Sequence, residues 1–130
     1  MVKASVIIVN YNGKRMLAEL FESLAGQSQP PDELIMVDNA SSDGSLEYVR
    51  ENFPWIKVVE SPVNVGFAEG NNLGLEQAQG EYIALLNNDT VVEKNWLAEL
   101  VRTLDQNERA GAAVSKMQAI RANLLHQLNP

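Results

Sequence analysis

Residues 80–91 read GEYIALLNNDTV, an apolar run that ends at the polar triplet Asn87-Asn88-Asp89. A short apolar run bounded by polar residues is typical of a buried strand. In an open α/β sheet, ligands bind in the crevice beyond the carboxyl ends of the strands. The stretch therefore predicts an α/β fold with a candidate site at that edge, because its last residues carry amide and carboxylate oxygens.

In the rest of the chain, apolar runs of strand length alternate with segments whose apolar residues recur at helical spacing. A cap at Ser42 or Asp43 is expected for the second helix, and a start at Lys94 or Asn95 for the fourth. The third helix is expected over residues 68–79. The expected strands are residues 4–9, 33–37, 56–59, 82–86 and 112–115. The apolar faces of the four helices are expected at Leu17, Leu20, Phe21 and Leu24; Leu46, Val49 and Phe53; Leu75 and Ala78; and Leu97, Leu100, Val101 and Leu104.

Strands separated by helices of this length imply right-handed crossovers and a mainly parallel sheet. The predicted fold class is therefore a three-layer α/β/α domain. A polar cluster follows each of the first four strands, and in a parallel sheet these clusters lie along one edge. They are Asn10-Tyr11-Asn12, Asp38-Asn39, Glu60-Ser61 and Asn87-Asn88-Asp89.

Composition limits what such a domain can bind. The chain has 130 residues, 45% of them hydrophobic, which suits a single core. Its formal net charge of -7, with scattered Lys and Arg residues, argues against a nucleic-acid partner. The absence of cysteine excludes disulfides and thiolate metal sites, which fits a reducing cytosol. The apolar run at the start is too short for a signal peptide or a membrane span, so a cytoplasmic location is expected.

The carboxylates at the crevice suggest two different roles. A carboxylate at the position of Asp38 commonly accepts hydrogen bonds from a nucleoside, and Asp89, flanked by amides, suits a Mg²⁺ or Mn²⁺ ion that also binds diphosphate oxygens. Structural alternatives stay open for both. Asp38 can accept N–H groups of the following turn, residues 87–89 can form a turn that caps the next helix, and Tyr11 can be a packed aromatic.

Four blocks in register carry a resemblance to a known family, through about residue 115. They are SVIIVNYN from Ser5, LIMVDNASSDGS from Leu34, NVGFAEGNNLGL from Asn64 and GEYIALLNNDT from Gly80. In order and spacing they resemble the family 2 glycosyltransferases with the GT-A fold, a Rossmann-like nucleotide-binding architecture. The wording of the last two blocks looks most like the bacterial rhamnosyltransferase-type members that build cell-surface polysaccharides.

The resemblance implies a role for each polar position. Tyr11 and Asn12 would lie beside the base and ribose of a nucleotide sugar, and Asp38 would bind the uracil or thymine ring or the ribose. The triplet would stand where the family carries its Asp-x-Asp signature, with Asp89 as the metal ligand and Asn87 in place of a carboxylate. The remaining positions that would face the donor are Asn64, Gly66, Asn72 and Asn88.

The activity implied is transfer of a sugar from a UDP- or dTDP-linked donor to an acceptor hydroxyl with inversion, assisted by a divalent cation. The acceptor would be a polysaccharide or a lipid-linked molecule at the inner face of the membrane. The family places its general base and acceptor site after the region matched here. The chain therefore resembles the donor-binding half, residues 1–115, and no catalytic base is expected within it, so that the isolated chain would be inactive.

The last residues, 116–130, depart from the family pattern. Their apolar positions recur at helical spacing and predict a helical tail, which favours a second interpretation: a non-catalytic module acting through protein or homo-oligomer contacts. His126, the single histidine, is expected to be solvated or packed. The glycines at 66, 70 and 74 do not form a phosphate-binding loop, because their spacing is wrong and no Gly-Lys-Ser/Thr follows. The apolar tail positions are Met117, Ile120, Leu124, Leu125 and Leu128.

Overall fold

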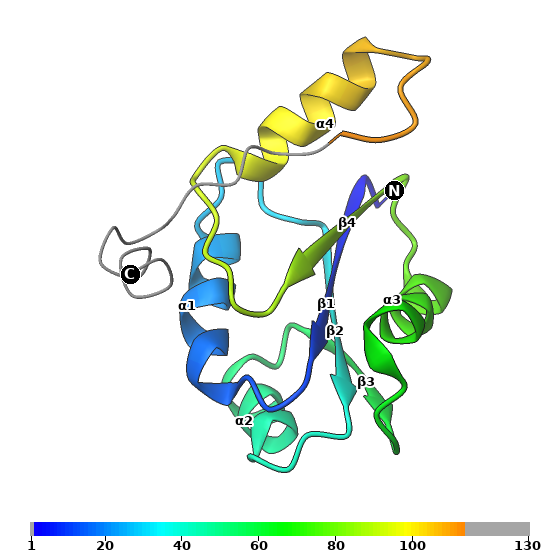
Figure 1. Ribbon diagram of the computed structural model, residues 1–130. Helices are drawn as coiled ribbons and strands as arrows, with labels where there is room; N and C mark the ends of the chain where they lie inside the picture. The colour runs from blue at the N-terminus through cyan, green and yellow to red at the C-terminus, as the bar shows by residue number, and fades with distance from the viewer. Residues whose placement is uncertain (1, 114–130) are drawn as a thin grey trace, which may run out of the picture.

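The computed structural model describes residues 2–113 and shows strands and helices in strict alternation (Figure 1). The expected tail helix and His126 lie outside the described residues. The strand expected at 112–115 is not formed at Ala112 and Ala113, and its other two residues are also outside them. The elements are β1 (Ala4–Asn10), α1 (Lys14–Ala25), β2 (Glu33–Asn39), α2 (Ser45–Asn52), β3 (Lys57–Ser61), α3 (Gly66–Gln77), β4 (Tyr82–Asn87) and α4 (Trp96–Gln106).

The four strands form one parallel sheet in the order β3-β2-β1-β4. Helices α1 and α3 lie on opposite sides of it, so the three-layer α/β/α architecture is confirmed (Figure 1). Because β2 and β4 flank β1 on its two sides, the direction of the strand order reverses next to β1. Such a reversal opens a crevice at the carboxyl ends of the strands.

The larger core lies between the sheet and helices α1, α2 and α4. The four residues expected on the apolar face of α1 are fully buried, which confirms that prediction. Val49 of α2 and Leu97 and Val101 of α4 are buried in the same cluster. Such a regular apolar stripe favours a helix at this place, because a helix puts these residues on one face and burying that face removes apolar area from water.

Helix α3 packs mainly by a face other than the expected one, although Ala78, which directly follows it, packs against the smaller core cluster as expected. Leu75 is 42% exposed, so its expected place on the packed stripe is wrong. The buried residues of α3 are Gly70, Asn71 and Gly74. A Cβ at Gly74 would stand 2.5 Å from Ile7 Cγ2, so the backbone of α3 lies directly against the sheet. The glycine spacing therefore serves close helix-sheet packing, because a residue without a Cβ lets the helix backbone lie against side chains of the sheet.

Strand β4 was expected to be buried, but it is covered on one face only. Ala84 and Leu86 pack against the larger core, whereas Ile83 and Leu85 are 38% and 51% exposed. The reason is the position of α3, which packs mainly on β1 and β2 and leaves the outer strand uncovered on that side.

Within residues 2–113, none of the helices has the length and apolar character needed to cross a membrane.

Candidate functional site

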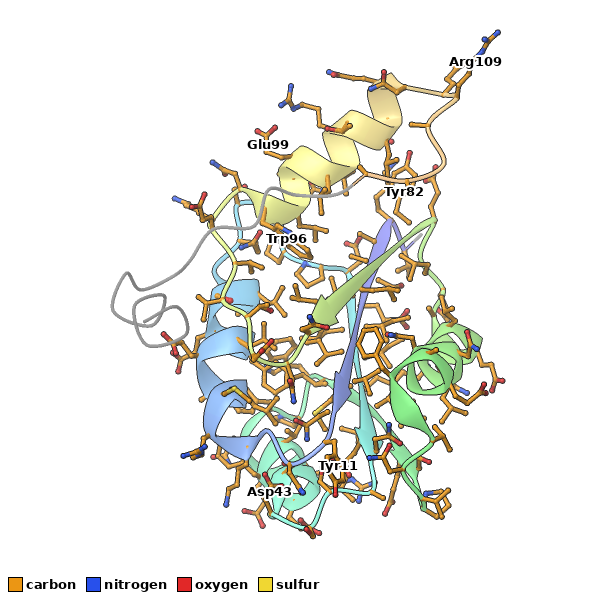
Figure 2. All side chains as sticks on the ribbon, viewed as in Figure 1. Tyr11, Asp43, Tyr82, Trp96, Glu99 and Arg109 are labelled. Carbon is orange, nitrogen blue, oxygen red and sulfur yellow. The ribbon has the colours of Figure 1, made fainter. Side chains whose placement is uncertain are left out.

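The polar ends of three strands meet at one edge of the sheet. Asn10 pairs in register with Asp38, and the neighbouring Val9 pairs with Asn87. Figure 2 shows Tyr11 and Asp43 at this edge, at the opposite end of the sheet from Tyr82. The convergence expected from the parallel topology is therefore present.

Asn10 lies at the centre of this edge and is fully buried. Its Nδ2 donates to Asp38 Oδ1 at 3.1 Å and to Ser41 Oγ at 3.3 Å. Its Oδ1 accepts a hydrogen bond from Asn88 Nδ2 at 2.9 Å. One carboxamide therefore joins the ends of β1 and β2 to the turn that follows β4.

Asp38 is only 2% exposed, and both of its carboxylate oxygens have protein partners. Besides the bond from Asn10, Oδ2 accepts the Ser41 N–H at 3.1 Å. This is the turn-stabilising role that the sequence left open. A carboxylate has about four acceptor sites, so these two bonds do not use its full capacity. Its contact with a nucleoside stays a prediction.

The loop after β1 carries exposed groups at the carboxyl edge of the sheet. Tyr11 is 52% exposed, so its ring is not buried as a packed aromatic. Asn12 has a φ of 52°, its N–H donates to Ser41 Oγ at 2.9 Å, and its Oδ1 accepts the Ser42 N–H at 2.7 Å. Non-glycine residues with positive φ are uncommon and cluster at functional sites. The loop that Asn12 contacts holds a second one, Ala40, with a φ of 64°.

A second buried amide, Asn39, holds the loop before α3. Its Oδ1 accepts the Val65 N–H at 2.9 Å, and its Nδ2 donates to the Gly66 carbonyl at 3.0 Å. Gly66 has a φ of 86°, which suits glycine, and its N–H donates to Asn64 Oδ1 at 2.9 Å. These hydrogen bonds fix the loop at Asn64 and Gly66 beside the end of β2, and Asn72 lies on the exposed side of α3.

The triplet after β4 has one residue turned inward and two turned outward. Asn88 is half-buried through its bond to Asn10, whereas Asn87 and Asp89 are exposed. The Thr90 hydroxyl donates to the Asn87 carbonyl at 2.6 Å, so residues 87–90 form a tight turn. Asn88 therefore supports the site from within, and the outward groups are the ones free to meet a ligand.

The donor set at this turn decides which metal site fits. Among residues 2–113, no three His, Cys, Asp or Glu side chains are grouped so as to hold a metal ion. The one carboxylate of the triplet, Asp89, matches the way Mg²⁺ binds through one or two carboxylates while keeping waters and substrate phosphates as its other ligands. Asp89 can supply one ligand to a cation that takes its other ligands from water and substrate, and residues 2–113 do not form a closed protein cage.

Asp43 stabilises the loop between β2 and α2. Its Oδ2 accepts the Lys14 N–H at 3.0 Å, and its Oδ1 accepts the N–H and the hydroxyl of Ser45. Burial alone raises the pKa of the Asp43 carboxyl, but hydrogen bonds from Ser45 and Lys14 outweigh it and hold the pKa below its usual value. Gly44, in the left-handed region, directly precedes α2, so the expected cap is one residue off while Asp43 still accepts N–H groups there.

Sequence reasoning gave no individual role to three residues that organise the site. Asn10 and Asn39 each end an apolar strand with a buried amide, and that position was a usable signal. Gly13 carried none. A Cβ there would stand 2.3 Å from Asn88 Nδ2 and 2.6 Å from Asn10 Oδ1, a contact that only the folded chain reveals.

Comparisons of the sequence identify relatives. The model of glycosyl transferase family 2 matches residues 5–127. An uncharacterized glycosyltransferase of Haemophilus influenzae is 28% identical over 119 residues, which are 89% of this chain and 37% of that protein. Poly(ribitol-phosphate) beta-N-acetylglucosaminyltransferase TarS of Staphylococcus aureus is 32% identical over 112 residues, 82% of this chain and 20% of TarS. The chain thus spans well under half the length of these relatives.

Solved structures share the fold. The crystal structure of S. aureus TarS 1–349 in complex with UDP-GlcNAc has a TM-score of 0.74 at 28% identity, covering 88% of this chain and 37% of that one. Mannosyltransferase PcManGT from Pyrobaculum calidifontis, in complex with GDP-Man and Mn²⁺, has a TM-score of 0.72 at 30% identity, covering 79% and 32%. The expected likeness to GT-A structures is confirmed.

Proposed function

The chain belongs to glycosyl transferase family 2, and from this premise we propose that the crevice at the carboxyl edge of its sheet binds the nucleoside diphosphate of a sugar donor. The observation that carries the proposal is the hydrogen-bonded chain Asp38–Asn10–Asn88. It joins the end of the crevice expected to hold a nucleoside to the turn expected to hold a cation.

We propose a division of labour along the crevice. Tyr11 and Asn12, which are exposed, contact the base and ribose directly. Asp38 accepts a hydrogen bond from the ring or the ribose with its remaining acceptor capacity. Asn64 and Gly66 border the same crevice from the loop held by Asn39. Asn72, on the exposed side of α3 beyond Gly66, is the last residue assigned to the donor.

The donor nucleotide is proposed to be UDP or dTDP. UDP is supported by solved complexes of TarS with UDP and with UDP-GlcNAc, while the mannosyltransferase neighbour was solved with GDP-Man. The sugar is open: these names and that of the cholesterol galactosyltransferase of Borreliella burgdorferi cover different sugars. The rhamnosyltransferase-like assignment therefore stays a prediction from sequence.

A divalent cation, Mg²⁺ or Mn²⁺, is proposed to accompany the donor, held by Asp89 with Asn87 beside it. Bound there, it would supply the positive charge that a diphosphate needs in a chain of net charge -7. The Mn²⁺ in the mannosyltransferase neighbour supports this assignment. Asn88 is not proposed as a metal ligand, because its Nδ2 donates a hydrogen bond to Asn10 Oδ1.

The whole protein is proposed to be an inverting transferase in the synthesis of a cell-surface polysaccharide. An acceptor hydroxyl, on a polysaccharide or a lipid-linked molecule, attacks the anomeric carbon while the nucleoside diphosphate leaves. The residues of this chain hold the donor and orient it. The general base is proposed to lie in the part of the relatives that the match does not reach. The reaction is proposed to take place at the cytoplasmic face of the membrane.

Calorimetric titration of UDP, dTDP and GDP in the presence of Mn²⁺, and again with chelator, tests the proposal. We expect saturable UDP binding that requires the metal and is lost in Asp89→Ala, whose exposed side chain contributes little to stability. A matched control is Asp105→Ala, which removes an exposed carboxylate at the opposite end of the sheet. Binding that survives chelator and Asp89→Ala would contradict the assignment of the metal site.

A second candidate, the non-catalytic interaction module, is favoured by the exposed Ile83 and Leu85 on β4. It predicts self-association or partner binding in place of nucleotide binding. If a folded chain bound no nucleotide in the titration but sedimented as a dimer, and Leu85→Ser restored the monomer, this candidate would replace the first.

A further inference from the structure

Asn10 is buried, so neither a nucleotide nor a metal ion bound at this edge would contact its side chain directly. Its side chain is fully buried beneath the crevice, at the point where β1 lies between β2 and β4. A carboxamide offers two N–H donors and one carbonyl acceptor. In Asn10 the N–H groups face Asp38 and Ser41, and the carbonyl faces Asn88.

The chemistry of its neighbours fixes which way the Asn10 amide points. The Asp38 carboxylate accepts hydrogen bonds and, when ionised, donates none, so the Asn10 Nδ2 must face it. The Asn10 Oδ1 is then directed at β4, where it accepts from Asn88 at 2.9 Å. The orientation at the nucleotide end thus determines the hydrogen bond that is available at the metal end.

The bond between Asn10 and Asn88 is shielded by the chain at Gly13. A Cβ at that residue would lie 2.3 Å from Asn88 Nδ2, so there is no room for a water molecule between the glycine and the bond. Hydrogen bonds shielded from water are stronger, and an amide left without its partner there is costly. The position of Asn88 is therefore closely defined.

The inward bond of Asn88 sets the direction of the residues beside it. Asn87 and Asp89 flank it on either side and are exposed, and the Thr90 hydroxyl closes the turn on the Asn87 carbonyl. If Asn88 lost its anchor, this turn could rotate away from the crevice, because β4 is an outer strand covered on one face. Among the described residues, the bond between Asn88 and Asn10 is the side-chain hydrogen bond that joins the Asn87–Asp89 turn to the ends of β1 and β2.

We propose that Asn10 is a positioning residue that holds the Asn87–Asp89 turn at a fixed place relative to Asp38, so that a single nucleoside diphosphate reaches both. The proposal rests on the proposed donor site and adds a residue to it that contacts neither ligand. Asn10 acts through Asn88, and its loss weakens the contribution of the metal to nucleotide affinity more than the affinity for the nucleotide alone.

The test measures the ratio of UDP affinity with Mn²⁺ to UDP affinity with chelator, by calorimetry. Loss of a group that orients metal ligands typically costs about 10- to 100-fold in metal affinity, so we expect the ratio to fall by about that factor in Asn10→Ala. Asn88→Ala should lower it equally, and the double variant should be no worse than either single one, because all three remove the same bond.

Gln27→Ala is the matched control. Gln27 is also a buried carboxamide that joins separate segments, since its Nε2 donates to the Glu93 carbonyl and its Oε1 accepts the Leu97 N–H, away from the crevice. Its loss lowers stability without changing the affinity ratio. If Asn10→Ala does not fold, Asn88→Ala decides alone, because its half-exposed side chain is removed at smaller cost.

Each outcome has a separate meaning. Metal-dependent UDP binding with an unchanged ratio in Asn10→Ala or Asn88→Ala would overturn the positioning role and leave the donor site standing. An equal fall in Gln27→Ala would also overturn it, by showing a general effect of lost stability. The absence of nucleotide binding in the unmodified chain would overturn the proposed function, and this inference with it.

Discussion

Ile7 and Leu85 lie side by side in register on the same face of the sheet, yet one is fully buried and the other is 51% exposed. Ile7 belongs to β1, on which α3 packs. Leu85 belongs to β4, which α3 leaves uncovered. The same contrast holds along the whole of β2 and β4, because Leu34–Asn39 are all buried whereas the exposure of β4 alternates from residue to residue.

The difference shows that the two halves of the crevice are supported in different ways. Asp38 lies near the end of a strand packed from both faces, so this side of the edge is held by the core itself. The Asn87–Asp89 turn ends a strand packed from one face, so its place depends on a few polar contacts. Core packing is stronger in sum than any single hydrogen bond, and the Asn87–Asp89 turn is therefore the more easily displaced.

The largest expected effect tests the contrast directly. Ile7→Ala should lower the free energy of unfolding by about 2–5 kcal/mol, because it empties a fully buried site. Leu85→Ala, on the neighbouring strand, should cost less than about 1 kcal/mol, since half of that side chain is already in water. Urea denaturation measures both. Equal losses would mean that the outer face of β4 is covered in solution.

The close approach of α3 is the cause of the contrast, and Gly74→Ala tests it. The added methyl meets Ile7 and Val37 side chains and should cost about 1–3 kcal/mol through overpacking, although alanine favours a helix by about 1 kcal/mol. Gly111→Ala is the control, because a Cβ there meets no atom within 4 Å. A gain in the stability of Gly74→Ala would show that α3 can move outward freely.

Asp43 supports the loop on the β2 side, and its contribution should depend on pH. Asp43→Asn should lower the free energy of unfolding by about 1 kcal/mol near pH 7, because it replaces the charge-assisted hydrogen bonds from Lys14 and Ser45 with weaker neutral ones. Because the pKa of this carboxyl is lowered in the folded state, its stabilisation is full above the usual pKa near 3.8 and is lost as pH falls through the lower folded value.

Unfolding of the Asp43→Asn variant and the unmodified chain in parallel from pH 7 to pH 2 measures this dependence. The difference between the two free energies should be constant down to about pH 5 and shrink below pH 4. A difference that grows towards low pH would have the wrong sign for a lowered pKa.

The smallest effect is expected at the start of β4. Asp105 accepts the Tyr82 hydroxyl at 2.7 Å and pairs with Lys3 at 3.0 Å, but these groups are exposed. The Tyr82 hydroxyl, with Lys3, lowers the pKa of Asp105. Exposed pairs contribute little, so Asp105→Asn should shift the thermal midpoint by less than Asp43→Asn does. A larger shift would place an important support of β4 at this end.

Much of the fold could be predicted because it repeats a pattern within each element. The apolar stripe of α1 from Leu17 to Leu24 can be recognised from its own spacing. The meeting of the polar strand ends at one edge follows from the parallel topology. The exposed face of β4 and the glycine face of α3 could not be read in the same way. Both depend on where α3 crosses the sheet, which no local period encodes.

The candidate site shows the same limit. Asp89 and Tyr11 stand in motifs, and their exposure agrees with groups that can meet a ligand. The roles of Asn10 and Asn88 depend on a bond between residues 78 positions apart, and a sequence pattern does not show which of two amides donates to the other. Their support of the site was visible only when the strands were placed side by side.

The strand order has a further consequence, for the time at which the crevice forms. β1, β2 and β3 are consecutive in the sequence, and each pairs with the next. β4 must return to the free edge of β1. Contacts between distant residues form against a larger loss of chain entropy, and a nascent chain supplies its first strands first. The Asp38 side of the edge can therefore form before β4 arrives, and we expect the pairing of Asn88 with Asn10 to form late in folding.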